Sequence, residues 1–425
     1  MSQPTLERTL TWIQGSALAI GAVLGSGILI LPAITAEQAG PASILAWLLM
    51  SLLAFPLAMT LGRLGAKHPH AGGIVEYARL AFGSTVSRMT AWLFLGTIPI
   101  GVPIIALVGA DYAASTLGLP AWSIPLMAGV MLVSSLMLHW RGVNLASWAQ
   151  VVVLLLIAAL MIMAIGAAAS HIHLSAYRPI APHGWLPAAK SAVEIFWCFV
   201  GWEMVGHLAE EFRDPARDLR RTFVAAPLLV GILYVALSIV TVGTHAYGAT
   251  NGLAPLSRMV GIGLGRAGSD VAGLAALLVT MVAIHGNVAG FSRMVYSQAR
   301  AGVFPALLGR LHVRHRTPSG ALLALGVDFL LVLTIDTAFH VNLGTLVKWP
   351  SVVFLIIYAV AMASALKLLK RDGRAARGPA LVSLAVCLAL YPISGWAMVY
   401  PAALGFLGWV ISRRTSLPVS RSSER

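Results

Sequence analysis

The stretch 21-GAVLGSGILILP-32 decides how this chain folds, because it interrupts a long apolar segment with glycines, a serine and a proline. Glycine weakens a helix, and proline ends or bends one. A helix that faces lipid cannot be broken, since the freed backbone N–H and C=O groups would have no partner. Gly25-Ser26-Gly27 is therefore either a close-packing patch between helices or an interruption inside the protein.

Composition places the chain in a membrane. Of its 425 residues, 58% are hydrophobic and 10% are charged, whereas soluble domains carry about 25% charged residues. The two cysteines lie in apolar runs and predict neither a disulfide framework nor a metal site. We expect an all-α integral membrane protein with about twelve transmembrane helices. The predicted spans are 12–35, 42–62, 86–117, 121–139, 146–169, 188–210, 222–246, 269–292, 319–337, 341–366, 379–393 and 395–411.

Positive charges predict the orientation. Of the 29 Lys and Arg residues, 24 fall in loops on one side of the predicted spans, four fall on the other side, and Lys348 lies within a span. Such a bias marks the cytoplasmic side, so both termini are expected in the cytoplasm, with the spans in the inner (cytoplasmic) membrane. The net charge of +14 then needs no nucleic-acid partner; the partners expected are the lipid bilayer and a small molecule.

A second interruption lies in 195-IFWCFVGWEMVGHLAEEF-212, where Gly201 stands in the middle of the sixth span. Breaks in the first spans of two five-span halves are typical of inverted-repeat transporters. We therefore expect one transmembrane domain over 1–411, with repeats at about 12–169 and 188–366 and broken helices one and six, a LeuT-like core. Two peripheral helices at 379–411 and a basic cytoplasmic tail at 412–425 complete it.

The two breaks predict a ligand. A half-helix starting near Ser26 would offer free N–H groups and a positive dipole end to a carboxylate. Carbonyls between Trp197 and Val200 would accept hydrogen bonds from an ammonium group. A site with both features suits a zwitterion, and hence an amino acid.

Several motifs resemble the amino acid–polyamine–organocation transporters over nearly the whole chain. They are GSGILILP (25–32), HPHAGGIVEYARLAFG (68–83), FWCFVGWE (196–203), EEFRDPARDLRRT (210–222) and FSRMVYSQARAGVFP (291–305). The combination with AWLFLGTIPIGVP (91–103) most resembles the bacterial exporters of L-methionine and branched-chain amino acids.

The resemblance implies roles for matching residues. It assigns the substrate carboxylate to Gly25, Ser26, Gly27 and Ile28, the amino group and gating to Trp197, Phe199 and Gly201, and a substrate-facing side chain to Asn287. The fifth span, 146–169, lacks the lysine that some proton-coupled relatives carry there.

Ionisable residues inside spans are candidates for function. Glu203 and His207 are four residues apart and share a helix face, which suggests a pH-sensitive gate. His285, near Asn287, is a second candidate for gating or proton coupling. Asp328 and Lys348 are expected to form a structural ion pair between spans nine and ten.

These observations predict a secondary transporter and no enzyme. We expect export of neutral apolar amino acids, namely methionine, leucine, isoleucine and valine, by alternating access with proton coupling. An importer or exchanger of the same fold is the alternative, and Na⁺ stays open as the coupling ion. A membrane haem or redox subunit is the alternative from another class. No cofactor or metal is expected, and the sequence leaves monomer and homodimer open.

One motif matches a nucleotide-binding pattern but lies in the wrong sequence context. Residues 263–268, GLGRAG, match the dinucleotide fingerprint, but the segment follows no predicted strand, and position 285, about twenty residues on, is a histidine. The sequence therefore argues against a nucleotide site.

Overall fold

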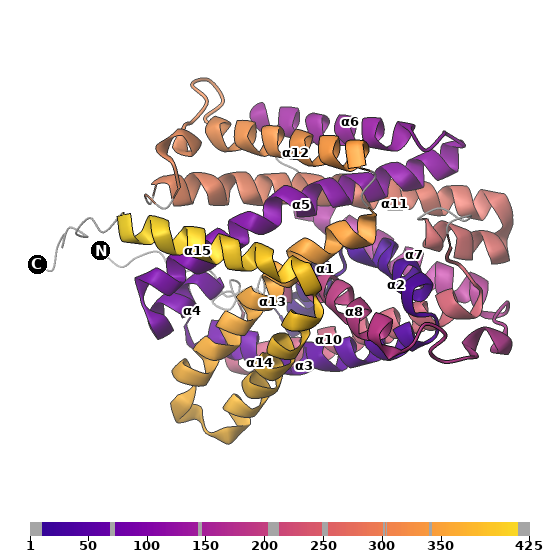
Figure 1. Cartoon of the computed structure of the whole chain (residues 1–425), viewed down its shortest axis with the longest axis horizontal. Helices are drawn as coiled ribbons and strands as arrows, with labels where there is room; N and C mark the ends of the chain where they lie inside the picture. The colour runs from indigo at the N-terminus through magenta and orange to yellow at the C-terminus, as the bar shows by residue number, and fades with distance from the viewer. Residues whose placement is uncertain are drawn as a thin grey trace, which may run out of the picture.

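Helices make up the architecture of the part of the chain that the structure describes (Figure 1). This computed structural model describes residues 11–68, 73–142, 147–202, 212–248, 254–300, 302, 304–339 and 342–414. The α-helices are α1 Trp12–Val23, α2 Leu31–Ala39, α3 Ala42–Lys67, α4 Gly73–Phe82, α5 Ser84–Leu117, α6 Ser123–Trp140, α7 Ser147–Ala169, α8 Trp185–Ile195, α10 Pro215–Gly243, α11 Pro255–Arg300, α12 Ser319–Phe339, α13 Leu343–Leu368, α14 Arg374–Ile393 and α15 Val399–Arg414. The 3₁₀ turns are η1 Ser26–Leu29, η2 Leu174–Tyr177, η3 Phe196–Phe199, η6 Ala306–Gly309, η7 Lys370–Asp372 and η8 Gly395–Met398.

Nine helices of the described residues are long and apolar enough to cross a membrane. They are α3, α5, α6, α7 from Val152, α10 from Arg217, α11, α12, α13 and α14. The two interrupted segments and the shorter apolar stretch Gly395–Ile411 account for the other three predicted spans. The prediction of an all-helical membrane protein is thus confirmed. That its two halves form an inverted repeat stays a prediction.

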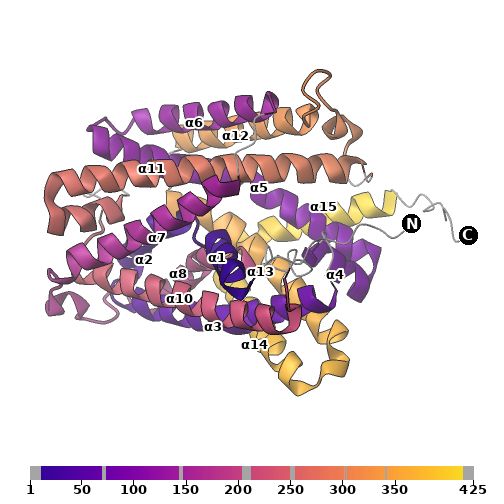
Figure 2. The same ribbon diagram turned by 180° about the vertical axis from the view of Figure 1, so that it is seen from behind.

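The helices form layers around the interrupted segments. In Figures 1 and 2, α6 and α12 lie outermost on one side, with α11 and α5 beneath them, and α10 and α3 close the opposite side. Between these layers lie α1, α8 and α13. The breaks are therefore enclosed by protein, which is where a membrane protein tolerates unpaired backbone.

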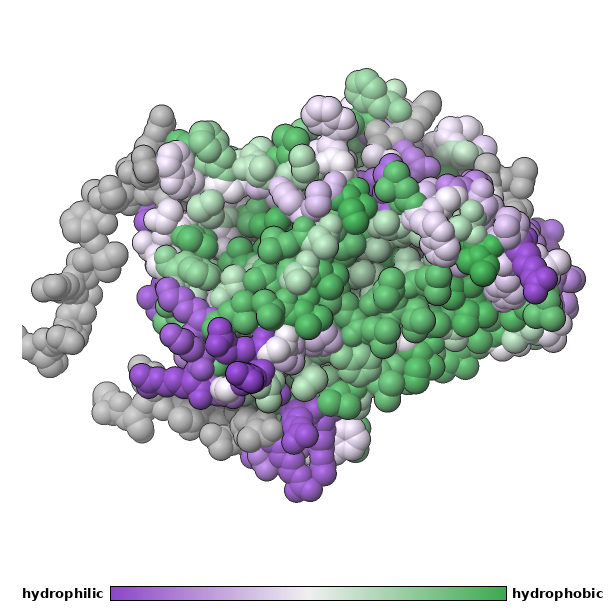
Figure 3. Space-filling view, turned by 60° about the horizontal axis from the view of Figure 1, so that its bottom comes forward, coloured by the Kyte–Doolittle hydropathy of each residue, from purple (hydrophilic) through white to green (hydrophobic). Residues whose placement is uncertain are grey.

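The surface agrees with a lipid environment. Hydrophobic residues cover the middle of the face in Figure 3, and hydrophilic residues gather toward the two ends of the long axis. Several large apolar side chains on α6 and α12 are exposed, including Val130, Val133, Leu323 and Leu330. Such exposure is costly in water but favourable against acyl chains.

Helix packing explains the glycines of residues 263–268. Gly265 has φ +69° and forms a corner inside α11, so that two helical segments meet there. A methyl group at Gly263 would lie 2.1 Å from the carbonyl oxygen of Ala167, so only glycine fits against α7. These glycines therefore shape a connection between helices.

Candidate functional site

The first predicted break is present. Helix α1 ends at Val23, and Gly25 is extended, with φ −101° and ψ −172°. The turn η1 then begins at Ser26, and α2 follows at Leu31. The first N–H groups of a 3₁₀ turn have no partner within that turn. The N–H of Gly25 donates to the carbonyl of Val23 at 2.7 Å, so the donors that we assign to this break are those at the start of η1.

The second predicted break is present as well. Helix α8 ends at Ile195 and continues as η3 to Phe199, after which Val200 is extended, with φ −82° and ψ 142°. Gly201 has φ +124°, which L side chains rarely adopt. The glycine at this position is thus a requirement of the backbone.

The two breaks lie against each other. A methyl group at Gly27 would lie 2.7 Å from Cδ1 of Trp197 and 2.9 Å from Sγ of Cys198. Trp197 also reaches α5, where a methyl group at Gly101 would lie 3.1 Å from the indole ring. Trp197 and Val200 are half-buried, whereas Ile28 and Phe199 are fully enclosed.

The predicted residues of the two breaks are therefore brought together, with different surroundings. Gly25 has open space beside its Cα, since its nearest neighbour to an added methyl group is 3.9 Å away. Phe199 packs edge-on against Tyr234, with ring centroids 5.2 Å apart. Half-buried Trp197 and Val200 and the open side of Gly25 are the positions that leave room for a ligand.

Three buried tyrosines hold the backbone of the breaks, and sequence reasoning missed all three. Tyr234 of α10 lies 3.2 Å from the carbonyl oxygens of both Val23 and Cys198, so its hydroxyl bridges the two breaks. Tyr112 of α5 donates to the carbonyl of Leu29 at 2.7 Å, and Tyr358 of α13 accepts the N–H of Gly201 at 3.1 Å. A buried tyrosine hydroxyl needs a polar partner, which was the available signal.

The remaining predicted site residues are Asn287, His285, Glu203 and His207. Asn287 of α11 is half-buried and donates its amide to the carbonyl of Ala283, one turn earlier in the same helix. His285 points toward α6, where its Nδ1 lies 2.9 Å from the hydroxyl of Ser135. The Nε2 of His139 lies 3.0 Å from the carbonyl oxygen of His285. The gate residues Glu203 and His207 lie outside the described residues, and the roles of all four stay predictions.

Sequence comparison decides the family. The profile of the family described as "Amino acid permease" matches residues 10–414. The chain belongs to the amino acid permease family. This permease is 45% identical to the uncharacterized amino acid permease YecA of Bacillus subtilis (strain 168), over 96% of each chain. It is 31% identical to the L-methionine/branched-chain amino acid exporter YjeH of Escherichia coli (strain K12), over 97% of this chain and 98% of that one.

A third relative is named as a permease and not as an exporter. The permease is 23% identical to the branched-chain amino acid permease BcaP of Bacillus subtilis (strain 168), over 96% of this chain and 92% of that one. The protein is thus a multi-pass amino acid transporter and no enzyme, and family membership displaces the alternative of a haem or redox subunit.

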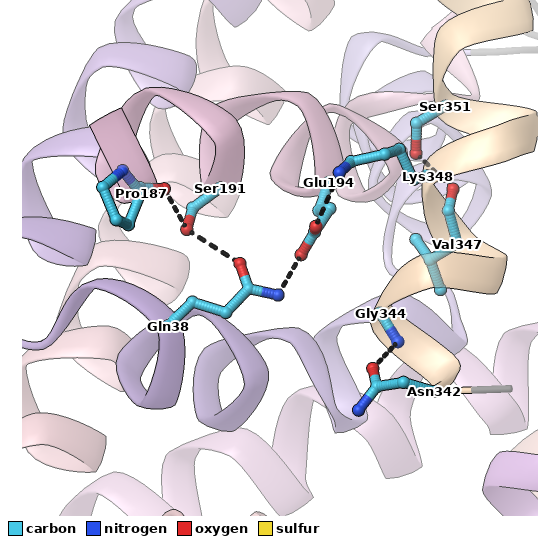
Figure 4. A network of polar contacts seen from close by, with 9 residues as sticks. All are labelled: Gln38, Pro187, Ser191, Glu194, Asn342, Gly344, Val347, Lys348 and Ser351. Carbon is cyan, nitrogen blue, oxygen red and sulfur yellow. Dashed lines mark hydrogen bonds and ion pairs between the residues drawn. The ribbon is translucent and has the colours of Figure 1, made fainter. Parts of the chain in front are cut away.

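The permease also holds a buried ion pair that differs from the predicted one. Lys348 of α13 lies 3.9 Å from Glu194 of α8 and does not pair with Asp328. The predicted partner was wrong because α13 packs against α8, whereas α12, which carries Asp328, packs against α5, α6 and α11. The carboxylate of Glu194 also accepts a hydrogen bond of 3.0 Å from Gln38 of α2 (Figure 4).

Proposed function

We propose that this permease transports neutral apolar amino acids and that the two breaks bind the substrate's main-chain groups. The observation that carries the proposal is the contact between the breaks. The N–H end of η1 lies beside the carbonyl end of η3 in the interior of the helix layers. The substrate carboxylate would bind the N–H groups at Ser26 to Ile28, where the helix dipole is positive, because the N–H of Gly25 already donates to the carbonyl of Val23 at 2.7 Å.

The ammonium group would bind carbonyls at the end of η3. The carbonyl of Cys198 already accepts the Tyr234 hydroxyl, and that of Trp197 accepts the N–H of Val200. The carbonyls of Phe199 and Val200 are therefore the ones that we assign to the ammonium group. The position is the C-terminal end of a 3₁₀ turn, where carbonyl groups have no partner within the turn.

The neighbouring side chains favour an apolar substrate. Trp197 packs edge-on against Phe354 of α13, with ring centroids 6.1 Å apart, and Ile28 completes the apolar surroundings. Methionine, leucine, isoleucine and valine are the substrates we expect. The names of YjeH and BcaP support this class, although YjeH is named an exporter and BcaP a permease.

We further propose that the permease exports its substrates and uses a proton gradient. The name of the exporter relative supports the direction. The distribution of Lys and Arg supports a location in the bacterial inner membrane with both termini in the cytoplasm. The importer or exchanger alternative is decided by the experiment below.

Flux through purified permease in proteoliposomes tests the substrate class. Labelled methionine, leucine, isoleucine and valine should move, and labelled arginine should not; flux of arginine without methionine or leucine would overturn the class. In intact cells that express the permease, labelled methionine should be retained less than in cells with an empty vector. Greater retention would replace export by import.

A matched pair of glycine variants tests the site. Gly25→Ala places a methyl group in the open space of the break, whereas Gly166→Ala on α7 adds one with no atom within 4 Å. We expect Gly25→Ala to raise the KM for leucine about tenfold, equivalent to ~1.4 kcal/mol, and Gly166→Ala to leave it unchanged. An unchanged KM in Gly25→Ala protein would remove Gly25 from the site.

A further inference from the structure

The network around Glu194 joins three elements on one side of the breaks. Helix α2 follows the first break and α8 precedes the second, so both lie on the same side of the breaks, together with the start of α13. Gln38 of α2 donates to the Oε2 of Glu194, and Lys348 of α13 faces its Oε1 at 3.9 Å. Figure 4 shows the carboxylate of Glu194 between the two side chains.

The groups around Gln38 and Glu194 are closely packed. The hydroxyl of Ser191 lies 3.3 Å from the Oε1 of Gln38, which fixes the orientation of the amide. A methyl group at Gly344 would lie 3.3 Å from the Nε2 of Gln38, so α13 approaches α2 closely here. The side chain of Glu194 is only 3% exposed and that of Lys348 is 24% exposed.

The surroundings of Glu194 stabilise its ionised carboxylate only weakly. Removing a carboxylate and an ammonium from water costs several kcal/mol each, which a buried pair recovers only in good geometry with further hydrogen bonds. The contact of 3.9 Å between Glu194 and Lys348 is at the long end for an ion pair, and among the described residues the amide of Gln38 is the one hydrogen-bond donor to the carboxylate. A proton on Glu194 would remove the charge that attracts Lys348.

We propose that Glu194 is the positioning residue that couples protonation to opening of the permease on the α2–α8 side. The ionised carboxylate holds α2, α8 and α13 together. Uptake of one proton from the water on that side neutralises the carboxylate, frees Lys348 and makes separation of the half-helices easier, and loss of the proton favours their closure. The inference rests on the proposed proton-coupled transport and names the residue that carries the proton.

Other ionisable groups near the network define the controls. His183 matters most, because its Nδ1 lies 3.1 Å from the carbonyl oxygen of Gln38. Lys190, one turn before Glu194 on α8, and Glu37 on α2 are exposed. The other ionisable groups on the elements packed against α8 are Cys198 of η3, Arg63 and Lys67 of α3, Tyr358 and Lys367 of α13, and Arg374, Arg377, Cys387 and Tyr391 of α14.

The test measures leucine transport in proteoliposomes, both as accumulation driven by a pH gradient and as exchange without a gradient. Glu194→Gln mimics the protonated carboxyl, so we expect accumulation to fall at least about tenfold while exchange stays within about threefold of wild type. Asp328→Asn, which removes a half-buried carboxylate in α12, and His183→Gln should keep the wild-type response to pH.

Lys348→Met gives an independent measurement. Without the ammonium the carboxylate keeps its proton to higher pH, so the midpoint of the pH profile of exchange should move by about one unit or more toward alkaline pH. A wild-type response to the gradient in Glu194→Gln protein, or loss of that response in His183→Gln protein alone, would overturn the proposal. If Glu194→Gln protein does not insert, an unchanged midpoint in Lys348→Met overturns it. Absence of leucine flux in the wild type would instead refute the proposed function.

Discussion

The Tyr234 hydroxyl is the contact whose loss the structure predicts most directly. It lies 3.2 Å from the carbonyl oxygens of Val23 and Cys198, and its side chain is fully buried. Tyr234→Phe keeps the ring, which also packs edge-on against Trp47 at 5.5 Å, and removes only the oxygen. Two buried carbonyl groups then lose a shared donor.

The expected cost follows from these two carbonyls. Leaving a buried polar group without its partner costs about 1–3 kcal/mol. The carbonyl of Val23 keeps the N–H of Gly25 at 2.7 Å, so we count the penalty once, for the carbonyl of Cys198, and expect the bridged arrangement to become less stable by a factor of about 5 to 150. The melting temperature in detergent should fall by several degrees, and leucine exchange should fall with it.

A matched variant separates this effect from the general loss of a tyrosine hydroxyl. Tyr391 of α14 donates to the carbonyl of Met398 at 2.7 Å near the surface, where water can replace it. Tyr391→Phe should therefore melt within about a degree of wild type, because surface changes usually cost less than ~0.5 kcal/mol. Equal melting temperatures and equal exchange for Tyr234→Phe and wild type would refute the reasoning.

Three further predictions concern the breaks and the surface. Gly201→Ala forces an alanine to φ +124°, which costs about 1–3 kcal/mol, so its yield and leucine exchange should both fall well below those of Gly166→Ala protein; equal values would contradict the backbone requirement. Trp197→Ala removes the indole that lies against both Gly27 and α5, and we expect weaker leucine binding, measured by isothermal titration calorimetry, at an unchanged oligomeric state. Lys67→Gln breaks an ion pair with Asp372 whose side chains are both 39% exposed, so its melting temperature should stay near that of wild type, because exposed pairs contribute about 0–1 kcal/mol.

The breaks could be predicted from the sequence because each places glycine inside an apolar segment. Glycine is costly inside a membrane helix, so Gly25, Gly27 and Gly201 stand out in apolar segments that otherwise read as continuous helices. The structure gives each of them a physical reason: open space at Gly25, contact with Trp197 at Gly27 and a positive φ at Gly201. Pro32 does not cause a break, since it lies in the first turn of α2, where its missing N–H costs nothing.

The partners of the breaks could not be predicted, because they depend on tertiary structure. The hydroxyl of Tyr234 reaches a carbonyl 211 positions away, and that of Tyr112 reaches one 83 positions away. Backbone carbonyls are present at every residue, so no pattern in the sequence marks the acceptor. Glu194 is different: an acidic residue inside a predicted span is a signal by itself, so it could have been singled out from the sequence, although it was not, whereas its partners could not.

The three tyrosines suggest how such a site can change shape without losing its hydrogen bonds. Tyr112 contacts the α2 side of the first break and Tyr358 contacts Gly201, so each holds one half-helix from a different helix of the surrounding layers. Tyr234 instead joins the end of α1 to the end of η3, which belong to half-helices on opposite sides of the breaks. Because a single proton is shared between two acceptors, either half-helix can move away while the hydroxyl keeps its bond to the other. Tyr234 is therefore placed to keep the two breaks in register as Glu194 releases one side.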